Sequence, residues 1–296
     1  METETKERTI EDVVKEHATL LSIIGAGIII AVSLNAPPRE IRTNSLQESV
    51  LPSSGVVLPI AWGDLGAKLV EAGVIDPEKL DTRYTNRGRF PDEYRNMLEK
   101  NANEKVVITA ANSGYLLNLL WAFGLANENP ILEDASEMMN PAYGGAGNFA
   151  STGGWTLAKG DAMEHYGKHM LVQLTSEQQA LVDRVSRNIY RPCCGNSTHF
   201  PDCNHGMAML GLLELIASQG VSEQDMYKTA LAVNSYWFPE TYLTIATYMR
   251  QKGIAWNRVS AKEMLSAPYS SASGYTNISS QVTRPSQGGG GGGCSA

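Results

Sequence analysis

Cysteine and histidine side chains gather in one stretch of the chain. Three of the four cysteines and four of the five histidines fall between residues 165 and 205 of a chain of 296. Thiolate sulfur and imidazole nitrogen are donors that transition metals prefer, and thiols also carry redox chemistry. An even scatter of these nine residues would leave far fewer of them in so short a window. We therefore predict that the functional site lies between His165 and His205.

The segment from residue 191 to residue 205, RPCCGNSTHFPDCNH, is the densest part of this window. Its prolines, glycine and asparagines disfavour regular structure, so that several side chains can turn toward one point. Cys203 stands close to the start of a predicted helix, where the helix dipole stabilises a thiolate. Asp202 or Asn204 is the expected N-cap of that helix. The donors that we expect to converge here are Cys193, Cys194, His199, Cys203 and His205.

Two further histidines form an H-x-x-x-H pattern. In a helix, His165 and His169 would lie one turn apart on one face, where they can share a metal ion. Met209 follows His205 by one helical turn and offers a thioether sulfur. The full set of predicted ligands is His165, His169, Cys193, Cys194, His199, Cys203, His205 and Met209. This set exceeds four ligands, so either some members orient the others or two metal ions bind.

The mixture of donors indicates which metal to expect. Thiolate, imidazole and thioether together suit copper, whereas cysteine and histidine without methionine suit zinc. We expect copper before zinc, with iron, including haem held by a histidine, after both. The protein would then carry a metal or transfer electrons.

Two other functions use the same cysteines. The first is a thiol–disulfide oxidoreductase, with Cys193, Cys194 and Cys203 as the redox thiols and Cys294 as the resolving thiol. Cys294 follows six consecutive glycines, a composition typical of a flexible tether. The second is an interaction domain held by a structural disulfide and without chemistry of its own. The cysteine spacing matches neither a standard zinc finger nor a C-x-x-C pair.

Composition and charge exclude one class of partner. The net charge is −7 and no basic stripe is present, so the chain lacks the cationic surface that neutralises phosphates. We therefore expect no nucleic-acid partner. Hydrophobic residues make up 43% of the chain, which is typical of a globular protein.

An apolar segment near the N-terminus predicts a membrane anchor. Residues 18–38 contain no charged side chain, and about 20 such residues are enough to span a bilayer as a helix. We predict a single-pass anchor in the cell membrane, preceded by a polar segment at residues 1–17, with the larger domain outside the cytoplasm. A cleaved signal peptide and a buried core helix are the alternatives.

The rest of the chain is predicted to be mainly α. We expect a linker at residues 39–54, a single multi-helix domain at 55–285 and a flexible glycine-rich tail at 286–296. Helices are predicted from Trp62 to Gly73, from Pro77 onward, and over 113–124, 175–190, 205–218 and 222–253, the last interrupted at Pro239. The best strand candidate is 106–109, although a helix start fits it equally well.

Overall fold

The computed structural model describes residues 39–85, 92–99 and 102–282. The chain divides after Ser45 into two units, and the fold considered below is that of the unit from Leu46 onward. In the described residues the helices are α3 (Arg39–Val50), α4 (Leu65–Glu71), α5 (Pro77–Thr85), α6 (Asp92–Glu99), α7 (Ser113–Ala126), α8 (Ala150–Gly153), α9 (Ser176–Ser186), α10 (Asn204–Ser218), α11 (Glu223–Trp237), α12 (Pro239–Gln251), α13 (Ala261–Met264), α14 (Ala267–Ser270) and α15 (Ala272–Gln281). The strands are β1 (Val56–Gly63) and β2 (Ala102–Ile108). The prediction of a mainly helical protein is confirmed.

The predicted membrane anchor at residues 18–38 lies outside the described residues. Within the described ranges, no helix combines the length and the apolar character that crossing a bilayer requires. Helix α3 occupies most of the segment in which the sequence predicts a linker. The tail at 286–296, with Cys294, also lies outside the described part of the chain.

Strands β1 and β2 form a two-stranded antiparallel sheet, which pairs Val56 with Ile108 and Gly63 with Ala102. The prediction that a helix begins near Trp62 is wrong in its starting point, because β1 continues to Gly63 and α4 begins at Leu65. The signal for β1 is a period of two: the sequence alternates large apolar residues with small or proline residues. The alternating residues Leu58, Ile60 and Trp62 are all buried. The strand expected at 106–109 is the end of β2.

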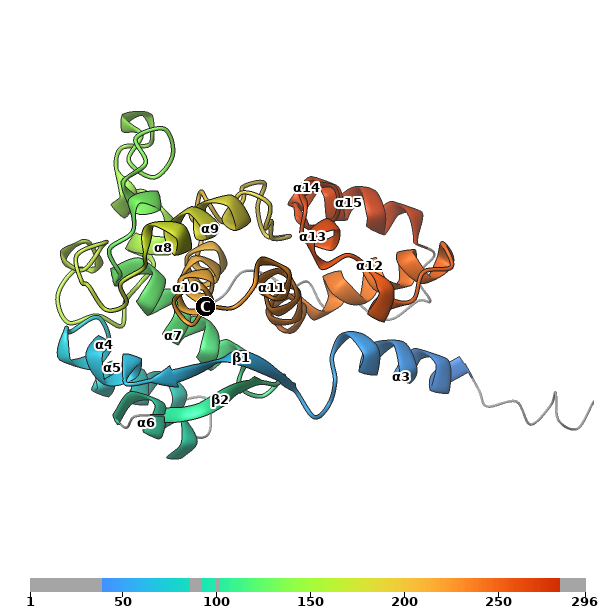
Figure 1. The fold of residues 1–296 in the computed structure, drawn as a ribbon, viewed down its shortest axis with the longest axis horizontal. Coiled ribbons are helices and arrows are strands. Elements are labelled where there is room, and N and C mark those ends of the chain that lie inside the picture. Colours follow the sequence, from blue (N-terminus) through green and yellow to red (C-terminus); the bar gives the residue numbers. More distant parts are fainter. Residues whose placement is uncertain (1–38, 86–91, 100–101, 283–296) are drawn as a thin grey trace, which may run out of the picture. The chain divides into compact units, whose positions relative to one another are not determined.

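Helices α7 and α10 form the centre of the core (Figure 1). Both are apolar around their whole circumference, and every residue of α7 from Tyr115 to Ala126 is buried. A helix without a polar face must be enclosed by other elements. Helix α10 is enclosed by α7, α9, α8 and α11, which contact it on different sides. It is therefore a rigid support for the residues at its N-terminus.

The crossing of α7 and α10 depends on two glycines. A Cβ atom on Gly124 would overlap the carbonyl oxygen of Met207 and lie 2.8 Å from the backbone nitrogen of Gly211. A Cβ on Gly211 would lie 2.5 Å from the carbonyl oxygen of Leu120. The two backbones can approach so closely only because neither residue carries a side chain.

Replacing Gly124 by alanine is expected to lower the free energy of unfolding by about 1–3 kcal/mol, because the helices must move apart. Urea denaturation measures the change. Gly114→Ala is the matched control, since the same helix has open space at that position. There the alanine is expected to be neutral or to stabilise by up to about 1 kcal/mol. Equal effects of the two substitutions would contradict the close crossing.

The helices around the site begin where local signals place them. Thr175 caps α9 and forms a capping box with Gln178, as the sequence predicts. Ser222 caps α11, and Pro239 is the first residue of α12, which explains the predicted interruption. The N-cap of α10 is Cys203 itself, rather than Asp202 or Asn204. Its Sγ atom accepts a hydrogen bond from the backbone of Gly206 at 3.4 Å.

Candidate metal centre

Three thiols meet in the connection between α9 and α10. The sulfur atoms of Cys193, Cys194 and Cys203 all lie within 4.8 Å of one another. Cys193 Sγ lies 3.7 Å from Cys203 Sγ, and all three cysteines are free. Each of the three residues is half-buried. We call these three residues the thiol cluster.

The backbone around the thiol cluster is held at both ends. Tyr190 and Ser197 form an isolated antiparallel bridge, which closes the loop that carries Cys193 and Cys194. The carbonyl of Cys194 accepts a hydrogen bond from the backbone of Ala272, at the start of α15. Cys203 is fixed by its position at the N-terminus of α10. Two thiols of one loop thus face a third on a rigid helix.

A buried arginine organises the loop. Arg191 is only 1% exposed, and its guanidinium donates to the Sγ atom of Cys203 at 3.0 Å. It also donates to the carbonyl oxygens of Asn196 and Phe200, both at 3.1 Å, and to a carboxylate oxygen of Asp202 at 2.6 Å. One side chain therefore joins both ends of the loop and places a positive charge beside the sulfur atoms.

The environment of the thiol cluster favours the thiolate form of Cys203 over that of its two neighbours. Hydrogen bonds donated by Cys193 and Cys194 hold the pKa of Cys203 well below its usual range, and the charge of Arg191 adds to this effect. The pKa of Cys193 is raised, first by its hydrogen bond to Cys194 and then by that to Cys203. The pKa of Cys194 is raised to about 11; its hydrogen bond with Cys193 lowers it, but the one with Cys203 and burial outweigh this.

The structure places His199 outside the thiol cluster. This imidazole is 2% exposed and lies between two carboxylates, with Nδ1 2.5 Å from Glu137 and Nε2 2.9 Å from Asp183. Asp134 completes a group of donor atoms within 4.8 Å of one another, together with Glu137 and His199. We call Asp134, Glu137 and His199 the carboxylate–histidine cluster.

His205 is also separate from the sulfur atoms. Its ring lies against the aromatic rings of Trp237 and Phe238, with centroids 5.8 and 4.4 Å away. Nδ1 of His205 contacts the side-chain oxygen of Asn204 at 2.9 Å. Burial lowers the pKa of His205 to about 4, which keeps the imidazole neutral at physiological pH. Met209 is 1% exposed and belongs to the core around α10.

His165 and His169 do meet, but not on a helix. The expected helix is absent, because a short 3₁₀ turn ends at Glu164 and Gly167 has a φ of +61°. Nδ1 of His165 nevertheless lies 3.0 Å from Nε2 of His169, and the rings stack. Nε2 of His165 contacts the carbonyl oxygen of Lys159 at 2.9 Å, so it carries the hydrogen and Nδ1 accepts from His169. The pKa of His169 is lowered by burial and by His165.

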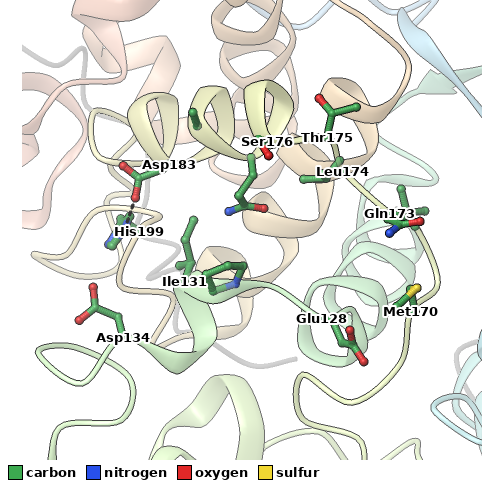
Figure 2. A pocket seen from close by; sticks show the side chains of 14 residues that line it. Glu128, Ile131, Asp134, Met170, Gln173, Leu174, Thr175, Ser176, Asp183 and His199 are labelled. Atoms are coloured by element: carbon green, nitrogen blue, oxygen red, sulfur yellow. Dashed lines mark hydrogen bonds and ion pairs between the residues drawn. The ribbon is translucent and has the colours of Figure 1, made fainter.

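A cavity of about 680 Å³ opens beside the carboxylate–histidine cluster (Figure 2). Asp134, Asp183 and His199 lie at one end of it, and Glu128 and Met170 at the other. Its lining comes from the segment before α9, the start of α9 and the segment after α7: Glu128, Pro130, Ile131, Asp134, Met170, Val172, Gln173, Leu174, Thr175, Ser176, Gln179, Ala180, Asp183 and His199. Three of these side chains are acidic, and none is Lys or Arg.

Sequence reasoning missed the residues that complete both clusters. Arg191 directly precedes the cysteine segment, and a single arginine in a loop gives no sign that it is buried. Glu137 lies 62 residues before its partner His199. No spacing rule connects positions so far apart, and only the packing of α9 against the preceding segments brings them together.

No protein-family model, curated protein or solved structure matches this chain.

Proposed function

We propose that this protein binds a soft transition metal at the thiol cluster, cuprous copper before zinc, and that it carries the metal. The observation that carries the proposal is the convergence of three free thiols, Cys193, Cys194 and Cys203, within 4.8 Å. The apolar segment at residues 18–38 supports the further proposal that a membrane anchor holds the domain outside the cytoplasm.

The spacing of the sulfur atoms supports metal binding. A metal–sulfur bond of about 2.3 Å keeps thiolate sulfurs about 3.8–4.0 Å apart in tetrahedral or trigonal coordination. The sulfur atoms of Cys193 and Cys203 are 3.7 Å apart, so a metal ion requires almost no movement of this pair. Bound thiolates carry negative charge, and the buried guanidinium of Arg191 offsets part of it.

The neighbouring donors favour cuprous copper over zinc. Three thiolates complete a trigonal shell, whereas zinc in a structural site takes four ligands. The carboxylate beside the thiols, Asp202, has both oxygens engaged: one accepts from Arg191 and the other from Asn196. Among the described residues, the group of donor atoms around these sulfurs consists of cysteines alone, which leaves an all-thiolate set.

The half-burial of the cluster supports carriage rather than a structural role. A partner protein's thiol must reach the metal to exchange with a bound cysteine. Cys193 and Cys194 lie in an irregular loop and are half-buried, whereas Cys203 is fixed at the N-terminus of α10. Ligand exchange can therefore proceed without unfolding the domain.

Titration of the reduced protein with cuprous ion, in competition with a chromophoric copper chelator, tests the proposal. One equivalent is expected to bind, and Cys203→Ser or Cys193→Ser is expected to weaken binding by at least about 100-fold, since even residues that only support ligands cost about 10–100-fold. Cys294→Ser is the matched control and is expected to retain the affinity. Stoichiometric binding that survives Cys203→Ser would overturn the proposal.

One observation favours a second function, that of a thiol–disulfide oxidoreductase. The 3.7 Å separation of Cys193 Sγ and Cys203 Sγ is short enough for a disulfide to form after a small movement. The thiolate of Cys203 would attack a substrate disulfide, and Cys193 would resolve the mixed disulfide. Reduction of a model disulfide by the protein, lost in Cys193→Ser, would support this function. Failure to turn over any disulfide in metal-free protein would exclude it.

A further inference from the structure

With a neutral His199, the carboxylate–histidine cluster has one hydrogen too few for its contacts. A neutral imidazole carries one N–H, yet both ring nitrogens of His199 face carboxylate oxygens, of Glu137 at 2.5 Å and of Asp183 at 2.9 Å. Whichever nitrogen holds the hydrogen, the other directs a lone pair at a negatively charged oxygen. A positive charge between the two atoms, a second proton or a metal ion, removes this repulsion.

Asp183 has the features of a carboxylate that orients a ligating histidine. The guanidinium of Arg187 holds it from the next turn of α9, donating to both of its oxygens at 3.0 and 3.1 Å. Asp183 in turn contacts Nε2 of His199. Histidines that bind metal ions almost always donate their second N–H to such a carboxylate. With a metal ion on Nδ1 of His199, the hydrogen of the imidazole lies on Nε2, where Asp183 accepts it.

The carboxylates around His199 outnumber the cationic side chains beside them, and this excess of negative charge favours a divalent cation. Arg187 forms an ion pair with Asp183, and its charge also acts on the carboxylates of Asp134 and Glu137. Neither of these two carboxylates forms a salt bridge with a Lys or Arg among the described residues. Asp134 accepts from the backbone and hydroxyl of Ser136 through one oxygen only. Two carboxylates and a neutral imidazole carry a net charge of −2. None of the residues that line the adjoining cavity is Lys or Arg.

We propose that Asp134, Glu137 and His199 bind a divalent cation that accepts nitrogen and oxygen donors, with Asp183 as the positioning residue. The ion takes its place between Nδ1 of His199 and the Glu137 carboxylate, which moves outward because its side chain is partly exposed. Three protein ligands leave positions on the ion open toward the 680 Å³ cavity, where water or an anionic ligand has space. This site is separate from the thiol cluster, so the inference does not rest on the proposed function.

Binding of Mn²⁺ to the full chain tests the site. Mn²⁺ prefers oxygen and nitrogen donors to thiolates, so the thiol cluster does not compete for it. The electron paramagnetic resonance signal of free Mn²⁺ disappears as the ion binds, and one bound equivalent is expected. Glu137→Gln and His199→Gln are each expected to weaken binding by at least about 100-fold, and Asp183→Asn by about 10–100-fold. Circular dichroism confirms that each variant is folded.

Two controls make the result specific. Asp225→Asn, which changes a surface carboxylate paired with Lys228, is expected to leave Mn²⁺ binding unchanged. The variant with Cys193, Cys194 and Cys203 all changed to serine is expected to bind one equivalent of Mn²⁺ and, equally, of Zn²⁺. The inference is overturned if the triple serine variant binds neither ion, or if Glu137→Gln in that variant does not weaken the binding. The result of the copper titration at the thiols does not affect this test.

Discussion

Replacing Arg191 by methionine is expected to lower the free energy of unfolding by about 3–5 kcal/mol, the usual cost of breaking a buried ion pair from one side. The guanidinium is 1% exposed and donates to four groups. Its loss leaves Asp202 half-buried without its counter-ion and removes one hydrogen bond from each of the carbonyl oxygens of Asn196 and Phe200. Methionine fills part of the volume but donates no hydrogen bond.

The same substitution is expected to weaken cuprous binding by at least about tenfold, because residues that orient ligands typically contribute this much. Arg191 both donates to Cys203 and connects the loop that carries the other two thiols. Arg191→Lys retains the charge but not the planar group of donors, so an intermediate loss is expected.

Urea denaturation and the copper titration measure the two effects of Arg191→Met. The matched control is Arg184→Met, which removes an exposed guanidinium that contacts Glu223 at 3.0 Å. This change is expected to cost less than about 1 kcal/mol, because exposed ion pairs contribute little. A loss of stability in Arg191→Met no larger than that in the control would contradict the organising role of Arg191.

The second large effect concerns the pH dependence of stability. Glu214 lies on α10 and is fully buried, and burial raises its pKa from 4.5 to about 8. One carboxyl oxygen accepts from the side-chain amide of Asn127 at 2.5 Å. The other oxygen of Glu214 has no hydrogen-bond partner. The folded protein therefore keeps this carboxyl protonated at neutral pH.

The sign of the effect follows from the two pKa values. Below pH 4.5 the carboxyl is protonated in both states, so it adds no pH dependence. Between pH 4.5 and about 8 only the unfolded chain releases the proton, so stability falls as pH rises. The slope is at most about 1.4 kcal/mol per pH unit, for a total of at most about 5 kcal/mol. Above pH 8 the contribution is constant.

Glu214→Gln is expected to remove this slope, because glutamine does not titrate. The free energies of unfolding of the variant and of the unsubstituted protein are measured between pH 5 and pH 8. As pH rises, the value for the variant should approach or exceed that of the unsubstituted protein. The comparison cancels other groups such as His205, whose lowered pKa acts in the opposite direction, below pH 6.5. Glu240→Gln, at an exposed position, is the control and should leave the profile unchanged. Parallel profiles for Glu214→Gln would contradict the buried, protonated state.

Glu214 also contributes to the position of the cavity wall, through its hydrogen bond with Asn127. Its partner Asn127 also accepts hydrogen bonds from the backbones of Leu171 and Val172, at 3.1 and 2.9 Å. Val172 lines the cavity beside the carboxylate–histidine cluster. Glu214 thus supports, through the side-chain amide of Asn127, the part of the cavity wall that contains Val172.

Local signals in the sequence were sufficient for most of the helices. The capping box at Thr175, the cap at Ser222 and the proline at Pro239 act within one turn of chain, so their effects do not depend on the rest of the fold. Local signals did not predict the two-stranded sheet. Strand β1 requires β2, some 40 residues later, to satisfy its backbone, although the alternation from Leu58 to Trp62 indicated it.

The stretch from His165 to His205 was identified by residue type alone, and the three thiols stayed together because one short loop carries them all. The histidines separated, because their directions depend on which elements pack around them. Gly167 turns His165 and His169 toward each other, and α9 brings Asp183 to His199. The sequence alone thus determined which donor residues are present and in which stretch of the chain. Tertiary packing decided which side chains they contact, because contacts between distant parts of the chain cannot be derived from local spacing.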